Sequence, residues 1–259
     1  MINGDWGRYL SGADIPITEC GIALTQPTIL QIEQVGEMDF LYGVSCFAQY
    51  EKIINTLRQG NTELEEVSDF QLLLEVINTS SGAQMKKGVD ILFSLCLPRY
   101  EVQWEEDSIV FLEQTEKELV PRGRVHGFNF DVFSAVIKDL FADKSALNKE
   151  DEYNPANEKA KEIADKIQKG KEKIAKQKGE KVDKEVSPGS LYGTMISILS
   201  VGVPYDINAL YNYTPFQLMD AFTRYMAKVA SDQYERISLV PLMDTSKIEA
   251  PEPWMRSLY

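Results

Sequence analysis

The sequence has very few residues of the types that carry out catalysis or bind metals. Its 259 residues include a single histidine, His126, and three cysteines, Cys20, Cys46 and Cys96, which stand far apart. Zinc sites draw their ligands from clustered histidines and cysteines, so we expect no metal site. Sparse, unpaired cysteines also indicate a reducing compartment and not a disulfide-stabilised secreted protein.

Patterns for phosphate binding and membrane insertion are missing as well. The glycine patterns of nucleotide-binding loops do not occur between a strand and a helix, and we expect no cofactor. No apolar run reaches the length needed to span a bilayer, and the first residues lack the charged-then-apolar pattern of a signal peptide. The sequence therefore predicts a cytoplasmic protein without membrane binding.

Two kinds of catalytic group stay open from the sequence alone. One is a pair of Cys46 or Cys96 with His126, although both cysteines lie in apolar helical patterns that are typical of buried thiols. The other is a set of neighbouring carboxylates, which in loops are usually solvated. These carboxylates are Glu65–Glu66, Glu105–Glu106 and Glu150–Asp151. We expect no enzymatic activity and assign no catalytic residue.

Negative charge is what the chain has in excess. Its net charge of −13 repels nucleic acid and anionic membranes as a whole. One segment differs, because ten lysines and seven acidic residues are interleaved between Glu158 and Glu185 along a thin apolar stripe. We interpret this segment as an exposed helix supported by i,i+4 ion pairs. Contact with an acidic partner or with another copy, and phosphate tracking, are its alternatives.

Changes in composition divide the chain into four segments. The boundaries follow the polar stretch after Ala142, the end of the lysine-rich pattern, and a proline-spaced tail. The predicted segments are an N-terminal α+β domain (1–142), a polar linker with the Lys-rich helix (143–187), a C-terminal helical region (188–243) and a Pro/Trp tail (244–259).

Hydrophobic periodicity predicts a mostly helical fold. Apolar residues keep helical spacing over 29–35, 37–57, 70–77, 85–97, 130–140 and from 190 onward. The period changes to two over 100–104 and returns over 109–112, which predicts a β-hairpin, and residues 119–125 extend the pattern toward a third strand. A short strand is expected at 20–25. The predicted fold class is α+β, predominantly α-helical, with a small antiparallel β-hairpin sheet in the N-terminal part.

The helix that begins after Thr214 is the densest apolar helix near the C-terminus. Thr214 and Gln217 have the spacing of a capping box, and Pro215 suits the first helical position. One face is expected in the core and comprises Leu218, Phe222, Tyr225 and Val229. Apolar residues off that face favour contact with a partner, and Met adapts well to such contacts. The residues assigned to partner contact are Phe216, Met219, Met226 and Ala227.

Three stretches of apolar and charged patterns follow one another in an order that can be compared with known proteins. They are ITECGIALTQPTILQIEQVGEMDF, NPANEKAKEIADKIQKGKEKIAKQKG and LYGTMISILSVGVPYDINALYNYTPFQLMDAFTRYMAKVASDQYE, with GRVHGFNFDVFSAVIKDLF following the hairpin. In this layout the chain resembles the tail assembly chaperones of long-tailed bacteriophages. The resemblance spans most of the chain and consists of loose apolar patterns. It departs at ISLVPLMDTSKIEAPEP, where a small-residue segment is expected, although PEPWMRSLY keeps Trp254.

The resemblance implies a non-enzymatic role in tail morphogenesis in the host cytoplasm. The expected partner is the tape-measure protein, held soluble while the tail tube polymerises, with the tail tube protein as a second partner and self-association of the chain. Trp254 joins the residues assigned to partner contact. The alternatives are a structural virion component, such as a connector or tail completion protein, and a nucleic-acid-handling factor that uses the Lys-rich helix. An enzyme ranks last.

Overall fold

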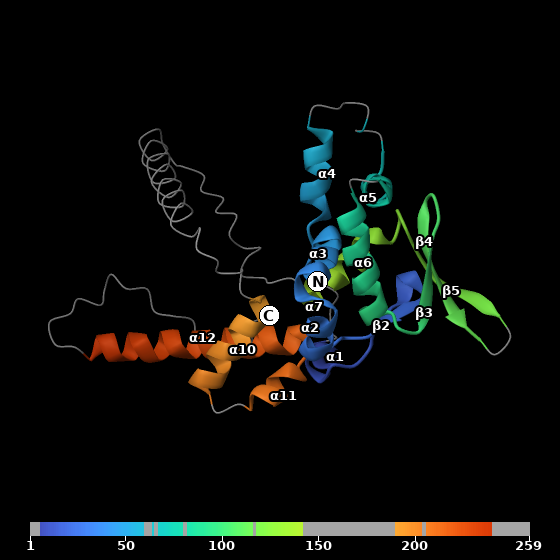
Figure 1. Ribbon diagram of the computed structural model, residues 1–259. Coiled ribbons are helices and arrows are strands. Elements are labelled where there is room, and N and C mark those ends of the chain that lie inside the picture. The colour runs from blue at the N-terminus through green and yellow to red at the C-terminus, as the bar shows by residue number, and fades with distance from the viewer. Residues whose placement is uncertain are drawn as a thin grey trace, which may run out of the picture. The chain divides into compact units, whose positions relative to one another are not determined.

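The computed structural model describes residues 6–59, 64, 67–79, 82–115, 118–141, 190–203 and 206–239. These residues form helices and two small antiparallel sheets, which confirms the predicted α+β fold class (Figure 1). Two units separate along the chain, one made of Met1–Ala142 with Tyr192–Tyr259 and the other of Asp143–Leu191. The predicted Lys-rich helix and the Pro/Trp tail lie outside the described residues.

The N-terminal elements form a short hairpin between two helices. Ile15 pairs with Leu24 in the antiparallel hairpin, and a turn through Gly21, at φ 69°, connects the two strands. The strand expected at 20–25 is confirmed, whereas its partner strand was not predicted, because an alternation of three residues is too short to recognise. The elements are α1 (Trp6–Ser11), β1 (Ile15–Ile17), β2 (Ile22–Leu24) and α2 (Ile29–Val35).

A close helix crossing lies between α3 (Glu37–Ala48) and α6 (Ala83–Cys96). A Cβ atom on Gly43 of α3 would overlap the carbonyl oxygen of Gly88 on α6, and a Cβ atom on Gly88 would lie 2.7 Å from the Gly43 nitrogen. Only residues without a side chain allow two helix backbones to approach this closely. Both glycines are therefore packing residues.

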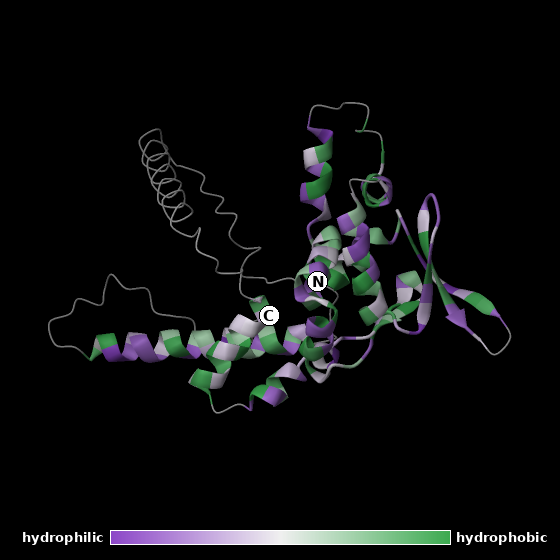
Figure 2. Cartoon of the chain, viewed as in Figure 1, coloured by the Kyte–Doolittle hydropathy of each residue, from purple (hydrophilic) through white to green (hydrophobic). Residues whose placement is uncertain are grey.

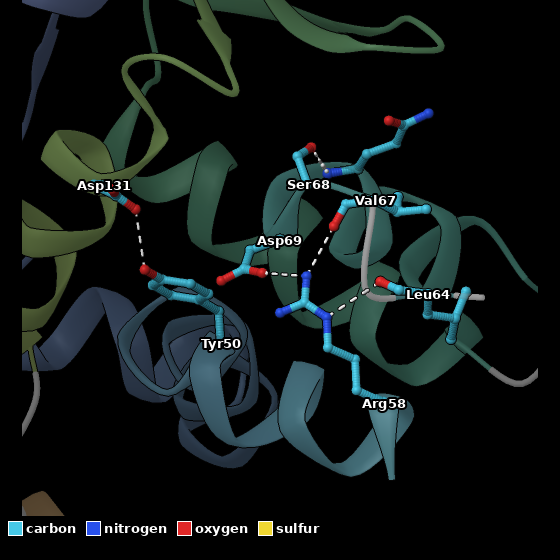
Figure 3. A network of polar contacts seen from close by, with 8 residues as sticks. Tyr50, Arg58, Leu64, Val67, Ser68, Asp69 and Asp131 are labelled. Atoms are coloured by element: carbon cyan, nitrogen blue, oxygen red, sulfur yellow. Dashed lines mark hydrogen bonds and ion pairs between the residues drawn. The ribbon is translucent and has the colours of Figure 1, made fainter. Parts of the chain in front are cut away.

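Polar contacts hold α4 (Tyr50–Arg58) against α5 (Asp69–Asn78) (Figure 3). Arg58 pairs with Asp69 at 2.7 Å and also donates to the backbone carbonyl oxygens of Leu64 and Val67. Ser68 is the N-cap of α5, since its hydroxyl accepts the N–H of Gln71. The helical pattern predicted over 37–57 is interrupted at Gln49, which separates α3 from α4.

The second sheet has the strand order β3-β4-β5 and is antiparallel throughout. Its strands are β3 (Tyr100–Trp104), β4 (Ser108–Gln114) and β5 (Leu119–His126), which confirms the hairpin and the third strand. Pro121 lies inside β5 next to a register shift at Phe111 and Leu112 of β4. Proline is tolerated there because β5 is an edge strand and the ladder is already irregular.

Aromatic side chains form the centre of the core. Phe47 of α3 lies 5.7 Å from Phe93 of α6 and 5.2 Å from Phe133 of α7 (Phe130–Phe141), measured between ring centroids. Phe93 also meets Phe111 of β4 at 5.8 Å, so the second sheet packs on the same cluster. One continuous apolar core thus joins α3, α6, α7 and the sheet.

Three C-terminal helices pack on the N-terminal elements. They are α10 (Leu191–Gly202), α11 (Ile207–Tyr211) and α12 (Pro215–Ser238). Their inward side chains, among them Tyr192, Leu199, Leu210 and Leu218, belong to the same core cluster as α3 and α6. Residues separated by more than a hundred positions along the chain therefore share one core.

Candidate partner-binding surface

The start of α12 is built as the sequence predicts. The Thr214 hydroxyl accepts the N–H of Gln217, and the Gln217 side-chain oxygen accepts the N–H of Thr214, which confirms the capping box. The remaining amide of Gln217 donates to the carbonyl oxygen of Leu10 at 2.7 Å. One side chain thus caps α12 and fixes it to α1.

Burial decreases steeply along α12. Leu218 is fully buried, and Phe222 and Tyr225 are partly buried against the core. Among the described residues of α12, none beyond Tyr225 packs against the core. The helix has 24 residues, and at a rise of about 1.5 Å per residue its far half extends roughly 20 Å past the last core contact (Figure 1).

The residues assigned to partner contact do not lie on one surface. Phe216 is only 3 % exposed and lies 5.3 Å from the ring of Tyr9, so it is a core side chain in this structure. Met219 is partly buried against the core, and Ala227 is half-buried. Met226 is 44 % exposed. Trp254 lies outside the described residues.

The sequence reasoning missed a second apolar face, on α10. Four side chains of this helix point into the core: Tyr192, Met195, Ile196 and Leu199. Its other side exposes Leu191, Ile198 and Val201, of which Val201 is 90 % exposed. The signal was present in LYGTMISILSVG, which has no charged residue and therefore has none to turn toward water.

A close contact brings the end of α10 to the middle of α12. A Cβ atom on Gly202 would overlap the ring and hydroxyl of Tyr225, so the two helices touch at this point. Val201 and Met226 are the sequence neighbours of this contact pair, and both are exposed. We call the exposed apolar residues Ile198, Val201 and Met226 on these two helices the α10/α12 surface.

Charged residues recur every four positions along α12 from Asp220 to Arg236. Asp220 and Arg224 form an i,i+4 ion pair at 2.9 Å, and Lys228, Asp232 and Arg236 continue the same spacing. Such pairs support a helix that lacks tertiary contacts. Figure 2 shows hydrophilic and hydrophobic residues interspersed along this part of the helix. The far half is thus an amphipathic helix with an exposed apolar side.

Activated cysteine nucleophiles have a lowered thiol pKa, whereas the thiols of this chain have a raised one. Burial raises the pKa of the Cys46 thiol to about 11, and burial together with the charge of Glu19 raises that of Cys20 to about 12. Cys46 donates to the carbonyl oxygen of Tyr42, while Nδ1 of His126 accepts the N–H of Phe128. A thiol held in its neutral form is a poor nucleophile, so these contacts favour a packing role.

Glu105, from the pair Glu105–Glu106, is engaged in structural contacts. Glu105 accepts from the hydroxyl of Ser108 and pairs with Arg124 at 3.3 Å. Within the part of the chain that the structure describes, no three His, Cys, Asp or Glu side chains form a group that could hold a metal ion. The pairs Glu65–Glu66 and Glu150–Asp151 lie outside the described residues.

No family model, curated protein or solved structure matches this chain. Across the described ranges, every helix is too short or too polar to cross a membrane. Among the described residues, the α10/α12 surface is the feature that bears most directly on function.

Proposed function

We propose that this chain is a non-enzymatic binding protein of phage tail morphogenesis, which holds apolar segments of the tape-measure protein during assembly of the tail tube. The observation that supports this proposal is the α10/α12 surface. On a chain with a net charge of −13, the exposed apolar side chains of Ile198, Val201 and Met226 lie on two helices that touch. Exposed apolar groups of this kind mark surfaces for protein contact.

The charge and the surface have complementary roles in this proposal. An excess of negative charge keeps complexes of the chain apart in solution. The exposed side of α10 and the far half of α12 offer an apolar strip to which an amphipathic client helix can add its own apolar side. Since each contact is small, many copies along one long client give the affinity that one copy lacks.

The same proposal covers location and further partners. The chain acts in the host cytoplasm, where its three cysteines stay reduced. It associates with other copies on the client, and it releases the client when the tail tube protein replaces it.

Co-purification with the tape-measure protein tests the proposal. We expect the wild-type chain to keep co-expressed tape-measure protein soluble, and the double variant Val201→Gln, Met226→Gln to reduce its soluble yield about tenfold or more. Both changes keep the net charge, so a loss of binding would come from lost apolar contact and not from altered charge. Phe128→Gln is the matched control, because Phe128 is fully exposed on the turn after β5 and is not part of the α10/α12 surface.

Two results would contradict the proposal. One is an undiminished yield of soluble tape-measure protein with the double variant. The other is abundant chain in purified virions, which would identify a structural component such as a connector or tail completion protein.

A further inference from the structure

The two edges of the three-stranded sheet differ. At β5 the edge is covered by backbone, since a Cβ atom on Gly123 would overlap the carbonyl oxygen of Cys20. A Cβ atom on Gly21 would likewise lie 2.7 Å from the carbonyl oxygen of Arg122, and Pro121 has no N–H to offer. The edge at β3 has no neighbouring strand among the described residues. β3 is therefore the edge to which a further strand can be added.

The outer backbone groups of β3 are unpaired in the part of the chain that the structure describes. The N–H of Glu105 donates to the carbonyl oxygen of Ser108 at 2.9 Å, where the chain turns from β3 into β4. Hydrogen-bonded and non-hydrogen-bonded pairs alternate along an antiparallel ladder, so the N–H and carbonyl groups of Val102 and Trp104 point away from β4. No hydrogen bond reaches these groups within the described ranges. Both side chains pack against the core, which holds the open edge in place.

A hollow on the exposed side of α6 borders this edge. The ring of Trp104 lies 6.1 Å from that of Phe93, and Nζ of Lys86 lies 4.1 Å from the centroid of the Trp104 ring. Lys86 also lines an open hollow of about 500 Å³, to which Asp90 and Ile91 contribute a carboxylate and apolar surface. Side chains of an added strand point alternately to the two faces of the sheet, so those on the α6 side have room in this hollow.

Negative charge is concentrated at the β3 side of the sheet. Residues 100–114 include five acidic residues and no basic one. Two of them, Glu105 and Glu113, are neutralised by arginines of β5. Across the described ranges, no ion pair involves the other three. These three are Glu101, on β3 itself, and Glu106 and Asp107, in the turn that follows it.

We propose that the open edge of β3 binds an extended basic segment of a partner protein by β-strand addition. Backbone hydrogen bonds to Val102 and Trp104 supply affinity, and lysine or arginine side chains near Glu101 and Asp90 select the segment. A second copy of this chain is a poor occupant, because its own β3 would bring further carboxylates against Glu101. This inference goes beyond the proposed function, since it uses a different surface and a different chemistry.

Two matched peptides test the strand addition on the full-length protein. One is a short synthetic peptide of alternating lysine and threonine, and the other has glutamate in place of each lysine. Hydrogen exchange followed by nuclear magnetic resonance reports the backbone N–H groups of Val102 and Trp104 one by one. We expect the lysine peptide to slow exchange at both groups by about tenfold or more, because a paired N–H is protected. The glutamate peptide should leave their exchange unchanged.

A pair of charge reversals tests the role of Glu101. Glu101→Lys should weaken binding of the lysine peptide about fivefold or more, since an attraction across the strands becomes a repulsion. Glu75→Lys is the matched control, because Glu75 is exposed on α5 and its reversal changes the net charge equally. We expect its affinity to stay within about twofold of the wild type. Circular dichroism checks that both variants are folded.

Four results would overturn the proposal. They are unchanged exchange at Val102 and Trp104 with the lysine peptide, equal protection by the glutamate peptide, equal losses of affinity for the two charge reversals, and protection that grows with protein concentration in the absence of peptide. The last would identify a second copy as the occupant. Should Glu101→Lys fail to fold, the two peptides on the wild-type chain decide.

The outcome is separable from that of the proposed function. The double variant Val201→Gln, Met226→Gln changes only the α10/α12 surface and should bind the lysine peptide as the wild type does. Loss of the tape-measure protein with retained peptide binding would therefore leave this inference intact. Absence of peptide binding would overturn this inference without bearing on the α10/α12 surface.

Discussion

The crossing of α3 and α6 and the part of α12 beyond Tyr225 are both helical but differ strongly in burial. At the crossing, Gly43 and Gly88 bring two backbones into contact, and the surrounding aromatic cluster is buried. In the far half of α12, no described residue packs against the core and Met226 stays exposed. Both are regular helices, so secondary structure alone does not distinguish them.

The α3–α6 crossing contributes to the stability of the core, whereas the exposed part of α12 leaves surface available for a partner. A buried crossing tolerates almost no change in volume, because neighbouring atoms already fill the space. A helix held mainly by its N-terminal half tolerates many changes at its other end and can add a partner there without rearranging the core. Four predictions test this contrast, in order of decreasing effect.

Gly43→Ala should have the largest effect on the free energy of unfolding. The added Cβ would overlap the Gly88 carbonyl, which is backbone and cannot rotate away, so we expect a loss of about 3 kcal/mol or more. Urea unfolding at neutral pH measures it. Gly7→Ala is the control, because Gly7 lies in α1 with open space around it and should gain up to roughly 1 kcal/mol. Equal effects at the two positions would refute the close crossing.

Leu218→Ala and Ile237→Ala compare the two ends of α12. Leu218 is fully buried, so its truncation should cost about 2–5 kcal/mol. Ile237 lies in the far half, and its truncation should change the free energy of unfolding by less than about 0.5 kcal/mol. Both values come from the same denaturation series. A comparable loss at Ile237 would show that the far half belongs to the cooperative core.

The buried thiols make the α3–α6 region sensitive to alkaline pH. Burial raises the pKa of Cys46, on α3, to about 11 from a reference of 9.0, and burial also raises that of Cys96, on α6. Above pH 9 the unfolded thiols release protons that the folded ones keep, so stability falls as pH rises from 9 toward 11. The slope should be at most about 1.4 kcal/mol per pH unit for each thiol.

Substituting both thiols gives the comparison for this pH dependence. The variant Cys46→Ala, Cys96→Ala should lose less free energy of unfolding between pH 9 and 11 than the wild type. Denaturation at stepped pH measures both slopes. Parallel curves for the two proteins would contradict the assignment to these thiols.

Val201→Gln and Met226→Gln should have the smallest effect. Both side chains are exposed, so each change should alter the free energy of unfolding by less than about 0.5 kcal/mol, as thermal or urea denaturation would show. This result is also required for the co-purification test, since a lost partner must not reflect a lost fold. A loss above 1 kcal/mol at either position would place it in the core.

Much of the fold could be predicted because its signals are local. Thr214, Pro215 and Gln217 define a helix start within four positions, and Ser68 does so for α5. The alternation over 100–104 likewise predicted β3. The β1–β2 hairpin was missed, since three residues carry too little pattern. The third strand was expected over 119–125, and β5 passes through Pro121 there with a register shift.

The candidate site was harder to predict, because exposure depends on the neighbours of a helix. Phe216 was assigned to a partner since it lies off the main apolar face of α12. Tyr9, some two hundred positions away, covers it. The exposed side of α10 was overlooked because the helix has no charged residue, and such a sequence is expected to be buried on every side. Sequence periodicity shows which faces of a helix are apolar, but it does not show which of these faces the rest of the fold will bury.

By itself, the sequence determined the fold class, the positions of most helices and strands, and the scarcity of catalytic residue types. These follow from spacing, capping and composition, which act over a few residues. Tertiary structure alone decided that Glu37 caps α10, that Gly43 meets Gly88, and that the apolar side of α12 is covered at one end and open at the other. Each of these depends on residues far apart in the sequence, whose proximity is set by packing of the whole core.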